Sequence, residues 1–113
     1  METTSPNTGV SLDGWDINHA DQLDWVPWGE GGARAKILGV ADGYVVALVE
    51  ADAGYRGTPH EHAYAEFFYL IDGRVTNQGT AMTAGDGYAA AAGSRHDHFQ
   101  ADTPARYLSI FKL

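Results

Sequence analysis

Five side chains able to bind a metal ion stand out in this sequence by their type and spacing. His60 and His62 lie two residues apart, and Glu66 follows four residues later. Successive side chains of an extended strand point to opposite faces, so these three positions would share one face. A second histidine pair, His96 and His98, repeats the two-residue spacing. A fold that brought the two segments together would offer three imidazoles and one carboxylate to a single ion.

The composition limits the fold and the partners. A chain of 113 residues, of which 44% are hydrophobic, can bury one core and not two. The formal net charge is -8 and the sequence contains no cluster of Lys and Arg, so a nucleic acid or an anionic membrane surface is not expected as a partner. The absence of cysteine excludes disulfides, thiolate ligands and thiol catalysis.

Short apolar stretches between turn residues predict an all-β chain with little helix. Apolar and β-branched residues favour strands at 33–38, 43–51, 66–71, 74–77, 80–83, 88–92 and 107–113. Asp42-Gly43 predicts a turn and Asp72-Gly73 a hairpin. Many short antiparallel strands in one small domain indicate a sandwich or a small antiparallel β-barrel.

The ends of the domain and its assembly are also predicted. Residues 1–11 are expected to form a flexible tail and residues 12–113 a single β domain. The tail lacks the pattern of a signal peptide, and no apolar run reaches the roughly 20 residues that span a bilayer, so a cytoplasmic protein is expected. Trp15, Trp25 and Trp28 cluster before the first predicted strand. Such a segment more often caps a core or an oligomer interface than binds a ligand, and we expect a homodimer.

The spacing of the glycines and ligand-type residues resembles the cupin superfamily. The first cupin motif places a glycine, two histidines, a glutamate and a glycine where this chain has Gly54, His60, His62, Glu66 and Gly73, with every spacing kept. The second motif is matched by Gly85, Gly93 and His96. It is altered at two positions, where Ala91 replaces the proline and Gln100 replaces the asparagine. The segments before the motifs are similar to small cupins related to acetylacetone-cleaving dioxygenases and to zinc-binding anti-sigma factors.

The resemblance implies a single jelly-roll barrel, the double-stranded β-helix of cupins, with one divalent transition metal ion per chain. Its ligands would be His60, His62, Glu66 and His96. Nitrogen and oxygen donors of this kind suit Fe(II), which we favour, and also Zn, Mn, Ni, Co or Cu. An octahedral ion would keep two positions open for substrate or O₂, whereas four protein ligands would saturate a tetrahedral zinc.

Further residues are candidates for the site around that ion. His98 and Tyr64 are candidate catalytic groups, although His98 could instead orient a ligand or be a bystander, and Tyr64 could serve packing alone. Phe68 and Leu70 are expected to form apolar walls of a substrate pocket. Alanine is a poor strand former, so the run containing Ala90 and Ala92 is interpreted as leaving space for a cavity beside the metal, which we favour over close packing against another sheet or subunit.

Three functions remain open from the sequence. The leading hypothesis is a non-haem iron dioxygenase acting on a small organic molecule. The second is a cyclase, isomerase or lyase that uses zinc or nickel as a Lewis acid without O₂. The third is a zinc-binding sensor or interaction module without catalysis, as in the anti-sigma factors.

Overall fold

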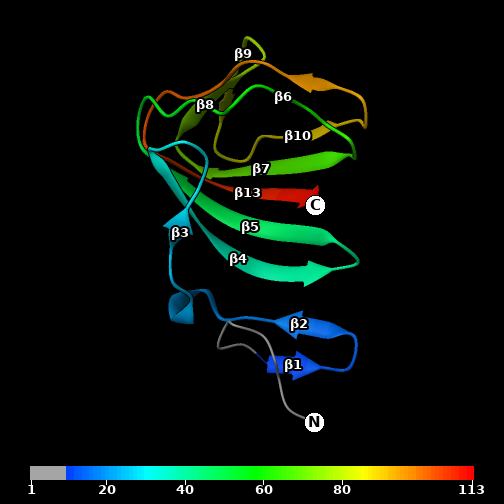
Figure 1. Ribbon diagram of the computed structural model, residues 1–113. Coiled ribbons are helices and arrows are strands. Elements are labelled where there is room, and N and C mark those ends of the chain that lie inside the picture. The colour runs from blue at the N-terminus through cyan, green and yellow to red at the C-terminus, as the bar shows by residue number, and fades with distance from the viewer. Residues whose placement is uncertain (1–9) are drawn as a thin grey trace.

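A computed structural model describes residues 10–113, and its strands form two facing layers (Figure 1). The larger layer is a six-stranded antiparallel sheet in the order β10-β7-β13-β5-β4-β3. Its strands are β3 (Val26–Pro27), β4 (Ala33–Ala41), β5 (Tyr44–Ala51), β7 (Glu66–Asp72), β10 (Gly87–Ala90) and β13 (Ala105–Lys112).

The facing layer consists of two small sheets with short strands. One is the pair β11-β6 and the other has the order β12-β8-β9, all antiparallel. The strands are β6 (His60–Glu61), β8 (Arg74–Asn77), β9 (Thr80–Thr83), β11 (Arg95–His96) and β12 (Phe99–Ala101). The predicted all-β jelly roll is confirmed, although hydrogen bonds do not close the sheets into a continuous barrel.

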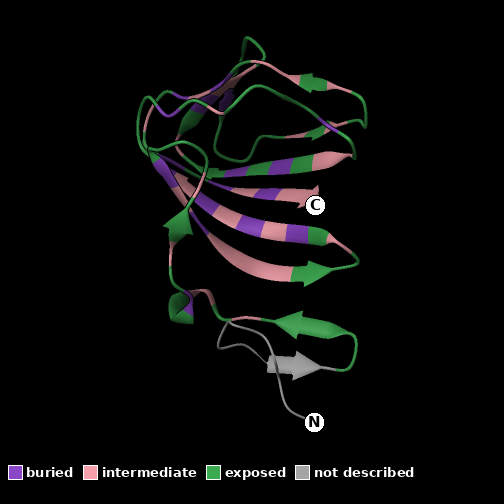
Figure 2. Ribbon diagram, in the orientation of Figure 1, coloured by how far each residue is buried: buried purple, intermediate pink, exposed green. Residues whose placement is uncertain are grey.

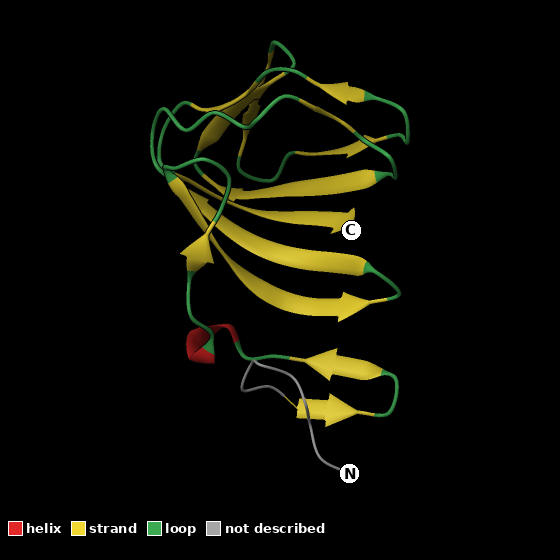
Figure 3. Ribbon diagram, viewed as in Figure 1, coloured by secondary structure: helices red, strands yellow, loops and turns green. Residues whose placement is uncertain are grey.

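A hairpin and one short helix precede these layers (Figure 3). β1 (Val10–Leu12) pairs with β2 (Trp15–Ile17), and the 3₁₀ helix η1 (Ala20–Gln22) follows. The Asp16 carboxylate accepts a hydrogen bond from the Val40 amide, and Asn18 donates one to the Leu38 carbonyl, so these side chains cover the outer edge of β4. The first nine residues of the expected tail lie outside the described residues, and positions 10 and 11 belong to β1. Across residues 10–113, no helix is long and apolar enough to cross a membrane.

The core lies between the two layers. Buried and partly exposed residues alternate along β5 and β13, as expected for strands with one face on the core (Figure 2). Val49 and Leu70 from the large sheet and Val75 and Ala101 from the facing layer are all fully buried in one cluster. The apolar contacts of this cluster therefore join the two layers.

The predicted turns differ in what they connect. Asp42 and Gly43 both have positive φ, at 52° and 81°, and join β4 to β5 as predicted. The prediction of a hairpin at Asp72-Gly73 is wrong, because β7 and β8 belong to different sheets. Gly73 has a φ of 92°, and a Cβ there would collide with the Pro104–Ala105 backbone. Glycine is required at this corner because the chain leaves the large sheet here in close contact with another segment.

Candidate metal centre

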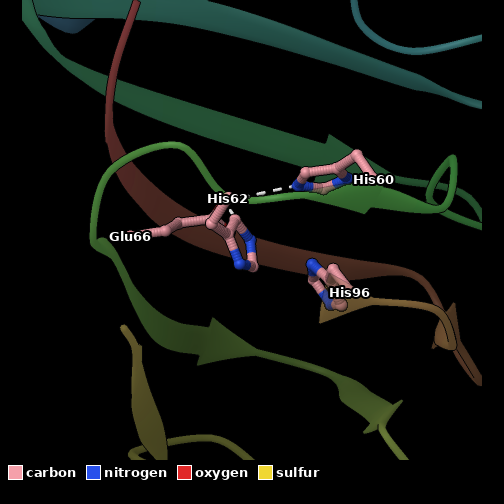
Figure 4. A group of neighbouring side chains, drawn as sticks. All are labelled: His60, His62, Glu66 and His96. Carbon is pink, nitrogen blue, oxygen red and sulfur yellow. Dashed lines mark ion pairs between the residues drawn. The ribbon is translucent and has the colours of Figure 1, made fainter. Parts of the chain in front are cut away.

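The four side chains predicted to bind a metal lie together between the two layers (Figure 4). Each offers a nitrogen or oxygen atom, and these atoms all lie within 4.8 Å of one another. β6 carries His60 and β11 carries His96, and these two residues are direct cross-strand partners. Glu66 begins β7 in the large sheet, so the centre joins both layers.

The expectation that one strand carries His60, His62 and Glu66 is wrong, although the side chains do converge. β6 ends at Glu61, and the chain bends at Ala63 and Tyr64 before β7 begins. His62 remains next to the second histidine segment through two backbone hydrogen bonds, from its amide to the Ser94 carbonyl and from the Gly93 amide to its own carbonyl. Convergence therefore comes from the turn and from pairing with the second motif.

Partners outside the cluster determine which nitrogen of His60 and of His62 carries the proton. His60 Nδ1 lies 2.8 Å from the Thr58 carbonyl oxygen, which can only accept, so Nδ1 carries the proton. His62 Nδ1 lies 2.8 Å from the Ser94 hydroxyl oxygen, which donates its own hydrogen to the Ala91 carbonyl. His62 Nδ1 is therefore a donor as well. Both histidines keep the lone pair of Nε2 for another partner.

The remaining nitrogens lack partners of the usual kind. His62 Nε2 is buried without a hydrogen bond, even though Glu66 Oε1 lies only 3.0 Å away. His60 Nε2 lies 3.7 Å from the same oxygen. Two nitrogen lone pairs and a carboxylate oxygen at these distances repel one another, and a cation between them would bind all three.

In His96 the two ring nitrogens have different surroundings. Nε2 lies 2.5 Å from the Asn77 side-chain oxygen, whereas Nδ1 is buried without a partner. Burial lowers the pKa of His96, and the nearby His60 and His62 lower it further against the opposing effect of Glu66. His96 is therefore neutral at pH 7, which is the form that binds a metal. The donor set and the two orphaned buried nitrogens fit a divalent transition metal.

Tyr88 holds the other oxygen of Glu66. Its hydroxyl donates to Glu66 Oε2 at 3.1 Å. Burial, followed by the charge of Glu66, raises the pKa of Tyr88 well above its usual range, so the hydroxyl keeps its proton and remains a donor. Glu66 is thereby oriented with Oε1 facing His60 and His62.

A cavity of about 340 Å³ adjoins the centre, and aromatic rings make up most of its wall. His60, Glu66 and His96 line one part of it. The aromatic residues of the wall include four buried ones, Tyr55, Phe68, Phe99 and Tyr107, and three half-buried ones, Trp28, Tyr88 and Phe111.

The other residues expected at the site occupy different places. Phe68 lines the cavity, whereas Leu70 is fully buried in the core. Ala90 lines a smaller hollow of about 250 Å³ that also touches His62 and His96, whereas Ala92 is exposed and lines neither of these spaces.

The two candidate catalytic groups do not line the aromatic cavity. Tyr64 is exposed, with Lys112 Nζ 4.7 Å from the centre of its ring. His98 is exposed and lines a separate hollow with Arg56 and Asp97. β11 ends at His96, and two residues outside any strand follow before the buried Phe99 begins β12, so the strand parity shared by His96 and His98 does not apply.

Sequence reasoning missed the residues that surround the ligand-type side chains. Ser94 lies inside the second motif and Thr58 two residues before His60, so proximity in sequence could have indicated both. Asn77 lies on another hairpin, and no local signal pointed to it. Trp28 was expected to cap a core or an interface, yet it lines the cavity.

Comparisons with known proteins agree with this fold. Residues 15–111 match the family model described as the ChrR cupin-like domain. No curated protein matches the chain at a significant level.

Three solved structures illustrate the likeness. A candidate acetylacetone dioxygenase from Methylibium petroleiphilum PM1 is 23% identical with a TM-score of 0.81, over 91% of this chain and 80% of that one. KdgF from a Halomonas species is 25% identical with a TM-score of 0.75, over 86% and 94%. A chain from the complex of SigE with the anti-sigma ChrR of Rhodobacter sphaeroides is 21% identical with a TM-score of 0.72, over 83% and 52%.

Proposed function

Because the chain belongs to the ChrR cupin-like domain family, we propose that it is a metal-dependent enzyme, a non-haem iron dioxygenase that acts on a small organic molecule. The observation that carries this proposal is the junction of the metal centre with a cavity lined by aromatic residues, since His60, Glu66 and His96 line that cavity directly. A site that only stabilises the fold would not need an adjoining space of substrate size.

The chain's own residues would hold the ion and prepare the site. His60, His62, Glu66 and His96 would be the ligands, and Thr58, Ser94 and Asn77 would orient the imidazoles. Tyr88 would keep Glu66 in place by donating its proton to Oε2. When bound, a redox-active divalent ion supplies the chemistry that couples an enolate or phenolate substrate to O₂. The aromatic wall would exclude water from the reacting atoms.

The test is oxygen uptake by protein loaded anaerobically with Fe(II), across β-diketones and catechol-like compounds. We expect uptake that requires both iron and one of these substrates, and its loss in His62→Ala. The matched control is His19→Ala, since His19 lies outside the cluster. Absence of uptake with every compound, in a sample shown by elemental analysis to be fully loaded, contradicts the proposal. Substrate conversion without uptake would favour the Lewis-acid reaction instead.

A second candidate function has its own support in the match to the ChrR family and in the similarity to a chain of the SigE–ChrR complex. On this alternative, the centre binds zinc and the domain contacts a protein partner without catalysis. This chain covers only 52% of that structure's chain. Pull-down with zinc-loaded and chelator-treated protein separates the candidates, because a partner retained only with zinc supports the interaction module.

The predicted homodimer remains a prediction. The outward side of β7 exposes Phe67, Tyr69 and Ile71, which is the kind of apolar surface that a second copy could cover. Light scattering at several protein concentrations is the direct measurement. A mass equal to that of one chain at all concentrations would contradict it.

A further inference from the structure

The wall of the aromatic cavity carries no positive charge. Among its lining residues there is neither lysine nor arginine, within the part of the chain that the structure describes. The polar groups of its side chains are those of His60, Glu66 and His96, the indole N–H of Trp28, and the hydroxyl groups of Thr58, Ser109 and three tyrosines. A substrate carboxylate held away from the metal would therefore be buried without a charged partner, which is costly.

Three tyrosine hydroxyls line the cavity, and one of them is engaged within the site. The Tyr88 hydroxyl is already donated to Glu66. A polyhydroxylated sugar needs many donors and acceptors along its length, and this wall presents mostly ring carbon atoms instead.

The rings are arranged in two groups. Phe68 stacks on Tyr88 with ring centroids 4.7 Å apart and planes inclined by 6°, and Tyr107 lies 4.7 Å from Phe68. The second group is the pair of Trp28 and Phe111, whose centroids lie 5.7 Å apart at 55°. Both rings of this pair are half-buried. Offset and tilted rings of this kind favour a further aromatic ring as a neighbour.

We propose that the cavity is selective for a neutral, planar substrate in which an aryl group is attached to the metal-chelating oxygens, with Trp28 and Phe111 contacting the aryl group. The inference rests on the proposed metal-dependent function and adds the class of substrate. It disfavours sugar acids and small aliphatic diketones, because neither uses the aromatic wall. A volume of about 340 Å³ lies within the lower range of small-molecule sites.

The experiment measures binding to the Fe(II)-loaded full chain without O₂, in which no oxidation interferes and an octahedral ion keeps positions open for the chelating oxygens. The probes are acetylacetone, benzoylacetone and galacturonate, titrated by calorimetry. The two diketones share the chelating group and differ by one phenyl ring in place of a methyl group. Burying that ring is expected to make benzoylacetone bind about 10- to 50-fold more tightly than acetylacetone. Galacturonate should bind more weakly than either diketone.

Two substitutions test the role of the Trp28–Phe111 pair. Trp28→Ala is expected to weaken benzoylacetone binding about tenfold and acetylacetone binding by less than about threefold. Phe111→Leu, which keeps the side chain apolar, should reduce the same preference to a smaller extent. Trp25→Ala is the matched control, because Trp25 contacts Lys36 and does not line the cavity. The control should bind both diketones as the unaltered protein does.

The possible failures are distinguishable. If neither diketone binds the Fe(II)-loaded protein, or if chelator treatment changes nothing, the proposed metal-dependent function fails. If both diketones bind in an iron-dependent manner with equal affinity, only the aryl selectivity is overturned. Tighter binding of galacturonate, or an aryl preference that Trp28→Ala leaves unchanged, overturns the inference as well.

Discussion

The two layers of the molecule are built differently although they enclose the same core. In the large sheet, β4, β5, β7 and β13 have seven to nine residues each, and they pair along nearly their whole length. In the facing layer, β6 and β11 have two residues each. Both β6 and β11 carry a histidine of the metal centre, whereas Glu66, at the start of β7, is the contribution of the large sheet.

This difference suggests a division between stability and binding. Long paired strands with buried side chains supply most of the free energy of folding, because apolar burial dominates that term. The short strands supply few such contacts, and hydrogen bonds to Thr58, Ser94 and Asn77 orient their imidazoles instead. Truncating a buried apolar residue of the large sheet should therefore mainly lower the free energy of unfolding. Removing a hydrogen-bond partner of an imidazole in the facing layer should mainly lower metal affinity.

The largest effect is expected for Leu70→Ala in the large sheet. Leu70 is fully buried, so truncation leaves a cavity and should lower the free energy of unfolding by about 2–5 kcal/mol. Zinc affinity of the folded protein should change by less than about threefold. Urea denaturation of metal-free protein and a chelator competition assay measure the two quantities. Leu113→Ala, at an exposed position, is the control and should stay within about 0.5 kcal/mol.

The opposite result is expected for Ser94→Ala in the facing layer. Without the hydroxyl, the proton is no longer held on His62 Nδ1. The ring can then adopt the tautomer with the proton on Nε2, which cannot bind the metal through that nitrogen. Zinc affinity should fall about 10- to 100-fold, while the metal-free protein loses about 1 kcal/mol or less of its free energy of unfolding.

Ser109→Ala is the matched control for Ser94→Ala. Ser109 is buried on β13 and lies outside the metal cluster, so zinc affinity should be retained. If Ser94→Ala destabilises the metal-free protein as much as Leu70→Ala does, the division between the layers does not hold.

Sequence alone predicted the elements whose signals are local. The strands β8 and β9 have the predicted bounds, and the turn at Asp42-Gly43 joins β4 to β5, because propensity and turn chemistry act over a few residues. The motif spacing also pointed to four side chains that the structure places within reach of one another. The motif spacing identified the cluster even though the assumption of a single strand was wrong. The spacing is tied to the positions of the side chains and not to one type of backbone element.

The residues that sequence did not predict depend on contacts between distant segments. Asn77 reaches His96 across 19 positions, and Trp28 enters the cavity beside Phe111, which lies near the other end of the chain. Strand parity failed for His98 because it assumes an unbroken strand, whereas β11 ends two residues earlier. Such contacts depend on how the two layers pack against each other, and a pattern of neighbouring residues does not predict that packing.

The smallest effect concerns a row of charges across the large sheet. Arg34, Glu50 and Arg106 are direct cross-strand neighbours on β4, β5 and β13. Glu50 accepts a hydrogen bond from Arg106 and lies 3.5 Å from Arg34 Nε. The hydrogen bond from Arg106 lowers the pKa of Glu50, with Arg34 acting in the same direction and partial burial opposing them.

The sign of the pH dependence follows from that lowered pKa. A carboxyl group whose pKa is lower in the folded state stabilises the fold at pH values above its ordinary pKa of 4.5, and this contribution is lost as the pH falls through the folded value. Glu50→Gln should therefore cost about 0.5–1 kcal/mol at pH 7, as expected for a partly exposed cross-strand pair. The difference from the unaltered protein should shrink below pH 4.5.

Urea denaturation across this pH range, with Glu30→Gln in an exposed loop as the control, measures the effect of Glu50→Gln. If the cost of Glu50→Gln persists at low pH, the Glu50 side chain stabilises the sheet by packing and not by its charge. The row of Arg34, Glu50 and Arg106 would then stabilise the large sheet by packing, as its buried residues do. If the cost disappears as expected, the charged row is a minor addition to a sheet that apolar burial already holds. Metal affinity should be unchanged in either case, because Glu50 lies outside the metal cluster.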